Sequence, residues 1–148
     1  MKRMEYSMIN KILIATHGRF AEGIYESMTM ITGEQSHVDY ISMYIDDTID
    51  YPNVIKGIVE KHDYTKENLI VLTDIIGGSV NSEFFKYMKC HPFHLITGLN
   101  LPLLLELVLA QTDAIEELLQ NVTKNTKEQI IYCNKLLNQT IDCEDGIF

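Results

Sequence analysis

The sequence has no tryptophan, only three prolines and three cysteines, and few basic residues for its length. Its 12 Lys and Arg residues against 21 Asp and Glu residues give a net charge of −9, which repels phosphate backbones and anionic lipid. Nucleic acid is therefore not an expected partner. The cysteines, Cys90, Cys133 and Cys143, are odd in number and irregularly spaced, so they predict neither a disulfide framework nor a paired metal site. Reduced thiols are expected.

Long apolar runs are also missing. The longest apolar block, 99–110, contains Asn100, Pro102 and Glu106, which makes it too short and too polar to span a bilayer. Near the N-terminus, Glu5 and Asn10 interrupt the apolar residues before a signal-peptide core can form. We therefore expect a cytoplasmic protein. Its 148 residues, 46% of them hydrophobic, predict a single domain over residues 1–148.

Short apolar strands alternate with amphipathic helices along most of the chain. The patterns predict strands at 11–18, 38–45, 68–74 and 93–97, and helices at 20–31, 51–62, 80–89 and 101–110. Short connections between alternating strands and helices are typical of parallel β-α-β units. The expected fold class is therefore α/β, with a mostly parallel four-stranded sheet flanked by helices.

Two stretches are predicted in more detail. In the first helix, Phe20, Ile24, Met28 and Ile31 fall on one face, which we expect to be buried, and Gly33 has the place of a C-cap. Further on, Asp113 and Glu116 have capping-box spacing for a helix over 114–121. The following residues, 129–134, fit either a continued helix or an added strand, and periodicity does not decide between them.

Polar residues gather where three of the strands end, at 16–19, 73–79 and 97–100. Because the carboxyl ends of parallel strands share one edge of the sheet, we expect His17 and Asp74 to be neighbours. A carboxylate that accepts one ring N–H fixes the tautomer of an imidazole and leaves the other nitrogen free for attack. Singly, each residue also fits a plain structural role, His17 as the end of a strand and Asp74 as a turn former.

The turn Gly77-Gly78-Ser79 offers backbone amides at a predicted helix N-terminus, which is a suitable site for an anion. Thr16 and Gly18 flank the histidine and complete the candidate phosphoryl-binding set. A nucleophilic imidazole, an orienting carboxylate and an amide-lined anion site together indicate phosphoryl transfer onto His17.

Competing motifs do not fit. Gly18-xxxx-Gly23 begins like a P-loop, but Ile24-Tyr25 stands where Lys-Ser/Thr is required. The hydrolase motif G-x-S-x-G is absent around Ser79. The run Cys90-His91-x-x-His94 has no fourth ligand at suitable spacing, so we predict no metal and no other cofactor.

Three segments carry a family resemblance: ILIATHGRFAEGI (12–24), IVLTDIIGGSVN (70–81) and HLITGLNLPLLLEL (94–107). They resemble the signature segments of the EIIA component of the mannose-family sugar phosphotransferase system (PTS). The resemblance implies that His17 is phosphorylated on Nε2, that Asp74 orients it, and that Gly77-Gly78-Ser79 is the active-site loop. It also implies a sheet of order 2-1-3-4 and a homodimer that exchanges an antiparallel C-terminal strand, here 129–134.

The resemblance further implies a phosphotransferase that takes a phosphoryl group from the protein HPr and passes it to an EIIB partner. Contact with the membrane subunits EIIC and EIID would be only indirect. One departure is Val80, where family members commonly have proline. Two alternatives remain open, a regulatory module that is phosphorylated on His17 and a phosphoryl donor to dihydroxyacetone kinase. The sugar cannot be inferred from this chain.

Overall fold

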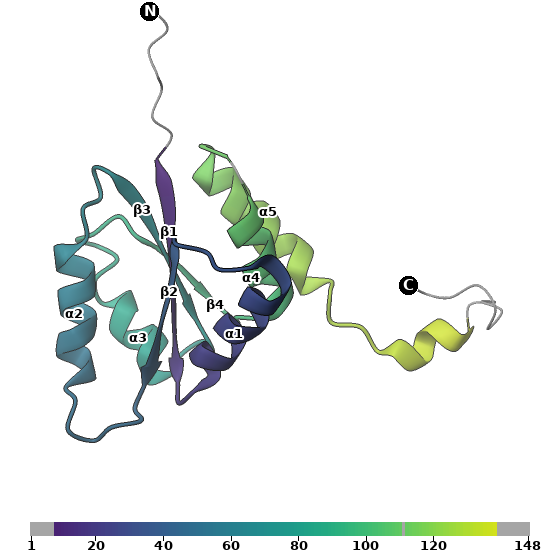
Figure 1. Ribbon diagram of the computed structural model, residues 1–148, viewed down its shortest axis with the longest axis horizontal. Helices are drawn as coiled ribbons and strands as arrows, with labels where there is room; N and C mark the ends of the chain where they lie inside the picture. The colour runs from purple at the N-terminus through teal and green to yellow at the C-terminus, as the bar shows by residue number, and fades with distance from the viewer. Residues whose placement is uncertain (1–7, 111, 139–148) are drawn as a thin grey trace, which may run out of the picture.

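The computed structural model of the protein describes residues 8–110 and 112–138. Its centre is one sheet of four parallel strands in the order β2-β1-β3-β4 (Figure 1). The expected α/β class and strand order are thus confirmed. The strands are β1 (Ile9–His17), β2 (Val38–Met43), β3 (Glu67–Thr73) and β4 (His94–Thr97).

Helices cover both faces of the sheet and form a three-layer structure (Figure 1). One face carries α2 (Tyr51–Lys61) and α3 (Ser79–Phe85), and the other carries α1 (Phe20–Thr32), α4 (Leu101–Leu109) and α5 (Ile115–Lys127). Alternate residues of the central strands supply the two cores. In β1, Ile12 and Ile14 pack on the α1 side, whereas Leu13 and Ala15 pack on the α2 side.

Helix starts follow local side-chain chemistry. The Asp50 side chain accepts the backbone N–H of Asn53 at 3.2 Å, and Pro52 lies in the first turn of α2. Asn100 likewise accepts the N–H of Leu103 at 2.9 Å at the start of α4. These two caps fix the residues at which α2 and α4 begin.

Several predicted boundaries were wrong. β2 stops at Met43, two residues before its predicted end. α3 ends at Phe85 rather than at residue 89, because the chain turns there.

The buried face of α1 also differs from the prediction: its buried residues are Ala21, Ile24 and Met28. Phe20 and Ile31, predicted on the buried face, are 46% and 61% exposed, because the small Ala21 takes the core position in the first turn.

The last helix is longer than expected and starts differently. α5 runs to Lys127, not to residue 121, and no side-chain hydrogen bond caps its N-terminus, so the Asp113–Glu116 capping box does not form. The hydroxyl of Thr112 instead accepts the N–H of Ala114 at 3.1 Å.

The segment after α5 is neither the helix nor the strand considered from the sequence. Residues 130–132 have no regular structure and are followed by a 3₁₀ helix, η1 (Cys133–Asn138), that extends away from the sheet (Figure 1). A strand needs a neighbour to receive its hydrogen bonds, and this segment has none within the described part of one chain. Ile130, Ile131 and Tyr132 are consequently exposed.

Among the described residues, no helix is long and apolar enough to cross a membrane. Cys90 and Cys133 are exposed free thiols. Cys143 and the N-terminal residues 1–7 lie outside the described residues, so the predictions made for them, and the extent of the single domain over 1–148, stay predictions.

Candidate functional site

His17 is the last residue of β1 and lies at the carboxyl edge of the sheet. It is in register with Met43, the last residue of β2. Gly18 follows with φ of 56°, a left-handed conformation that favours glycine, and its N–H donates to the carbonyl of Met43 at 2.8 Å. This turn ends the strand sharply and leaves the His17 side chain 41% exposed.

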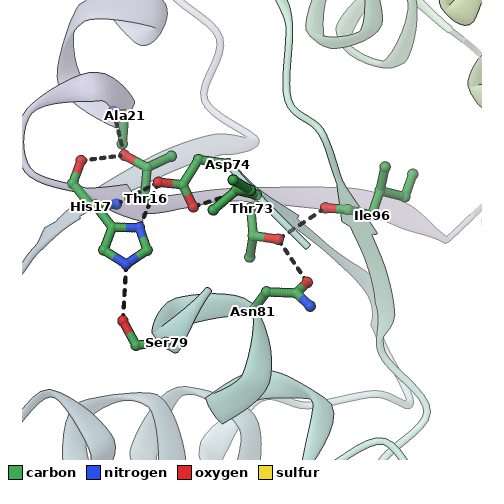
Figure 2. Close-up of polar contacts among 9 residues, drawn as sticks. Thr16, His17, Ala21, Thr73, Asp74, Ser79, Asn81 and Ile96 are labelled. Atoms are coloured by element: carbon green, nitrogen blue, oxygen red, sulfur yellow. Dashed lines mark hydrogen bonds and ion pairs between the residues drawn. The ribbon is translucent and has the colours of Figure 1, made fainter. Parts of the chain in front are cut away.

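Asp74 follows β3 and binds His17 twice through one oxygen (Figure 2). Its Oδ2 lies 2.7 Å from His17 Nδ1 and accepts the backbone N–H of His17 at 2.9 Å, while Oδ1 accepts the N–H of Ile75 at 3.0 Å. Partial burial raises the pKa of Asp74, but the hydrogen bonds from His17 and Ile75 and the charge of the imidazole outweigh it. The net pKa lies below the ordinary value of 3.8.

Ionised Asp74 determines which nitrogen of His17 carries the proton. A carboxylate can only accept, so Nδ1 donates, and the lone pair of the neutral ring is on Nε2. The Ser79 hydroxyl lies 2.9 Å from Nε2 and donates to it (Figure 2). The arrangement thus presents a nucleophilic nitrogen at an accessible edge, with a hydroxyl beside it.

The glycine turn packs closely against the ring. A Cβ added to Gly78 would lie 3.1 Å from His17 Cε1 and 2.8 Å from Ile75 Cγ2, so a larger residue there requires a shift. Gly77 has φ of 73°, which also favours glycine. Gly78 is the N-cap of α3. Ser79 is the first helical residue, one position before the predicted helix start, and its hydroxyl points at His17.

The model of one protein family, EIIA-man, described as the PTS system fructose IIA component, matches residues 11–131. The chain belongs to the EIIA-man family. It is a phosphotransferase-system EIIA component of the mannose family. Such components are, in the general sense, phosphotransferases, and they work together with other PTS proteins.

Relatives of this EIIA chain include the PTS system fructose-specific EIIA component of Bacillus subtilis, 26% identical over 86% of this chain and 89% of that protein. The PTS system mannose-specific EIIAB component of Escherichia coli K12 is 27% identical over 80% of this chain, which spans only 38% of its length.

Solved structures agree with the fold. A putative phosphoenolpyruvate-dependent sugar PTS permease from Klebsiella pneumoniae has a TM-score of 0.82 at 35% identity, covering 89% of this chain and 96% of that one. The mannose/sorbose specific IIA subunit from Enterococcus faecalis has a TM-score of 0.71 at 25% identity, covering 91% and 96%.

Not every predicted site residue of the EIIA chain faces the imidazole. Thr16 is fully buried, and its hydroxyl oxygen accepts the N–H of Ala21 at 2.7 Å, at the start of α1. Because side chains alternate along a strand, Thr16 and His17 point to opposite sides of the sheet. The phosphoryl-binding role predicted for Thr16 stays a prediction, and this hydroxyl already has a partner in the fold.

Two contributors were missed from the sequence. Asn81 in α3 is buried, and its Oδ1 accepts the hydroxyl of Thr73 at 2.9 Å, which ties α3 to the residue before Asp74 (Figure 2). Tyr44 stacks on the His17 ring with centroids 5.7 Å apart. The signal for Tyr44 is its place directly after β2, because the carboxyl ends of parallel strands share one edge of the sheet and Met43 is in register with His17.

Within residues 8–110 and 112–138, no three His, Cys, Asp or Glu side chains are grouped so that they could hold a metal ion. Cys90, His91 and His94 therefore form no such cluster.

Proposed function

We propose that this chain is a phosphocarrier that accepts a phosphoryl group on His17 Nε2 from phospho-HPr and passes it to an EIIB partner during sugar uptake. One observation carries the proposal. Asp74 Oδ2 engages Nδ1 at 2.7 Å, so the remaining nitrogen, Nε2, is the nucleophile and lies on the accessible side of the ring. Family membership makes phosphotransfer the expected chemistry.

The transfer step balances with the groups present. The Nε2 lone pair of His17 attacks phosphorus, a new N–P bond forms, and the N–P bond of the donor phosphohistidine breaks, with its electron pair going to the donor imidazole. The Nδ1 proton stays in the hydrogen bond to Asp74, whose negative charge stabilises the cationic ring. No proton has to leave His17, so the step needs positioning more than acid–base help.

Ser79 has two successive roles in this scheme. Its hydroxyl donates to Nε2 at 2.9 Å in the free protein and thereby holds the ring. On phosphorylation the hydroxyl rotates and donates to a phosphoryl oxygen instead. The backbone amide of Gly77 lies in the adjoining turn and would bind another oxygen, whereas the N–H of Gly18 donates to Met43 at 2.8 Å and that of Gly78 to Ile75 at 3.3 Å, so the phosphoryl-binding role predicted for these two glycines stays a prediction. Val80, which replaces the common proline, is buried in the first turn of α3 and is compatible with a helix that starts at Ser79.

The surroundings of His17 suit a protein donor. Several large apolar side chains are exposed next in sequence to the strand ends that form the site: Phe20, Ile45, Ile75 and Ile76, with exposures of 46%, 53%, 58% and 78%. Exposed apolar groups gathered around a reactive residue are typical of a docking surface. HPr and EIIB would use this surface in turn.

The C-terminal segment supports a homodimer. Ile130, Ile131 and Tyr132 are exposed, and the outer edge of β4 has no strand beside it in the described sheet. An antiparallel strand formed by residues 129–134 of a second chain would pair with this edge of β4 and bury its own apolar side chains. Ile131→Asp should then convert the dimer to a monomer in light scattering, whereas an unchanged mass would exclude this exchange.

The function is tested by incubating the protein with phosphoenolpyruvate, enzyme I and HPr. The wild type should acquire an acid-labile, base-stable phosphate, and His17→Ala should not. An absent label, or a label that persists in His17→Ala, would exclude the phosphohistidine. Subsequent addition of EIIB should remove the phosphate. If the phosphate stays on the protein with EIIB but is lost to dihydroxyacetone kinase, the protein is the phosphoryl donor to that kinase. If the phosphate stays with both, the protein is a regulatory module.

A further inference from the structure

Tyr44, directly after β2, has an unusual backbone. Its φ is 61°, and it is the one non-glycine residue with positive φ in the described part of the chain. Bulky side chains rarely adopt this left-handed conformation, which persists only where the surrounding structure enforces it. Such outliers are concentrated at functional sites, and Tyr44 lies beside His17.

Tyr51 contacts both the Tyr44 ring and the backbone that follows it. Its side chain is buried at the start of α2, and its hydroxyl oxygen accepts the N–H of Ile45 at 3.3 Å and that of Asp46 at 3.1 Å. The two tyrosine rings also pack together, with centroids 5.1 Å apart and planes at 54°. The backbone immediately after Tyr44 is therefore tied to α2, and the Tyr44 ring is directed toward the carboxyl edge of the sheet.

The Tyr44 ring stacks on the reactive imidazole. The centroids of Tyr44 and His17 are 5.7 Å apart and the planes differ by 28°, an offset-stacked geometry. Asp74 and Ser79 bind the two ring nitrogens and restrain the imidazole within its own plane. Stacking restrains it perpendicular to that plane, a direction that the two hydrogen bonds control poorly.

We propose that Tyr44, held by Tyr51, is a positioning residue that keeps the His17 imidazole aligned for phosphoryl transfer and stabilises its cationic form. The proposal rests on the proposed role of His17. The face of a tyrosine ring is electron-rich and attracts a cation within about 6 Å. The positive charge that develops on the ring during transfer strengthens the stack, so the contact favours the reacting state over the resting state.

The test compares two replacements of Tyr44. Tyr44→Phe keeps the ring. Tyr44→Asn removes it but supplies a residue that tolerates the left-handed backbone. Phosphorylation by phospho-HPr should keep its rate in Tyr44→Phe and fall about two- to fivefold in Tyr44→Asn, the range expected for an exposed cation–π contact. Thermal unfolding should show that both variants fold.

A spectroscopic signature separates stacking from a general structural effect. The ring protons of His17 should shift in the proton NMR spectrum of Tyr44→Asn, because the ring current of the tyrosine is lost, and should stay near their wild-type positions in Tyr44→Phe. This readout needs no phosphorylation, so it remains informative if the proposed phosphocarrier role fails. Unshifted His17 protons in Tyr44→Asn would overturn the proposal. So would a transfer rate in Tyr44→Asn equal to that of a wild type that is phosphorylated.

Tyr51→Phe provides an independent check on how Tyr44 is held. The variant loses the hydroxyl that accepts the amides of Ile45 and Asp46 but keeps the packed ring. The His17 ring protons should move part of the way toward their positions in Tyr44→Asn. If they do not move at all, Tyr51 does not hold the stack.

Discussion

One oxygen of Asp74 accepts two hydrogen bonds from the same residue, His17, from its backbone N–H at 2.9 Å and from its ring Nδ1 at 2.7 Å. The backbone contact fixes where the carboxylate lies relative to β1, and the ring contact fixes the tautomer. Asp74 therefore couples the end of β3 to the imidazole rather than merely lying near it.

Asp74→Asn should slow phosphorylation of His17 without unfolding the protein. The amide can still accept a hydrogen bond, but it no longer carries the charge that favours a proton on Nδ1 and a cationic ring. A hydrogen bond to a charged group contributes about 1.5–3 kcal/mol, which corresponds to a rate loss on the order of 10- to 100-fold. Rapid-quench measurement of transfer from phospho-HPr gives the rate, and a rate equal to that of the wild type would contradict the orienting role.

Gly78→Ala should impair transfer through steric contact alone. The φ of Gly78 is −64°, which alanine adopts readily, but the added Cβ would lie 3.1 Å from His17 Cε1. A ring displaced by a few tenths of an ångström should transfer about tenfold more slowly. Gly57→Ala in α2 is the matched control, because nothing lies within 4 Å of its added Cβ. The control should keep the full rate and gain about 0.5–1 kcal/mol of stability; equal rates in the two variants would show that Gly78 has no steric role.

The Thr73–Asn81 hydrogen bond should contribute to the free energy of unfolding. Asn81→Ala leaves the hydroxyl of Thr73, which is fully buried, without its 2.9 Å acceptor, and should cost about 1–3 kcal/mol in urea denaturation. Thr73→Val combined with Asn81→Ala removes both polar partners and should recover part of that loss, with Thr73→Val alone as the other single variant. Simple additivity of the single variants in this cycle would show that the pair is not coupled.

His94 should make stability depend on pH on the acid side. Burial lowers the pKa of this half-buried β4 residue below 6.5, and the charge of Glu116 in α5 opposes the shift only partly. Between 6.5 and the lowered pKa the unfolded chain binds more protons than the folded chain, so the free energy of unfolding falls as the pH falls through this window. His94→Gln should reduce that slope in denaturation measured from pH 7.5 to 5, and Glu116→Gln should extend the decline to lower pH. An identical slope in wild type and His94→Gln would refute this assignment.

Much of the fold and the central pair of the site could be predicted from the sequence. Alternation of apolar strands with amphipathic helices indicates parallel β-α-β units, and parallel strands bring His17 and Asp74 to one edge. Neither inference requires knowledge of side-chain packing.

The missed features all depend on contacts between distant segments. The apolar pattern of β2 continues through Tyr44 and Ile45, but the strand ends at Met43, because Tyr44 turns the chain with φ of 61° and the Tyr51 hydroxyl then accepts the amides of Ile45 and Asp46. The predicted buried face of α1 was wrong in its first turn, because helical spacing alone does not show that Ala21 rather than Phe20 packs on the sheet. Residues 129–134 have strand-like composition, but a strand forms only where a neighbour accepts its hydrogen bonds.

The most direct test of the account identifies the phosphorylated nitrogen. The protein, labelled with ¹⁵N in its histidines, is phosphorylated by phosphoenolpyruvate, enzyme I and HPr, and the ring nitrogens are assigned by NMR. We predict a phosphoryl group on Nε2 of His17, with Nδ1 protonated and bound to Asp74. A phosphoryl group on Nδ1 of His17, or on any of the other four histidines, would contradict it.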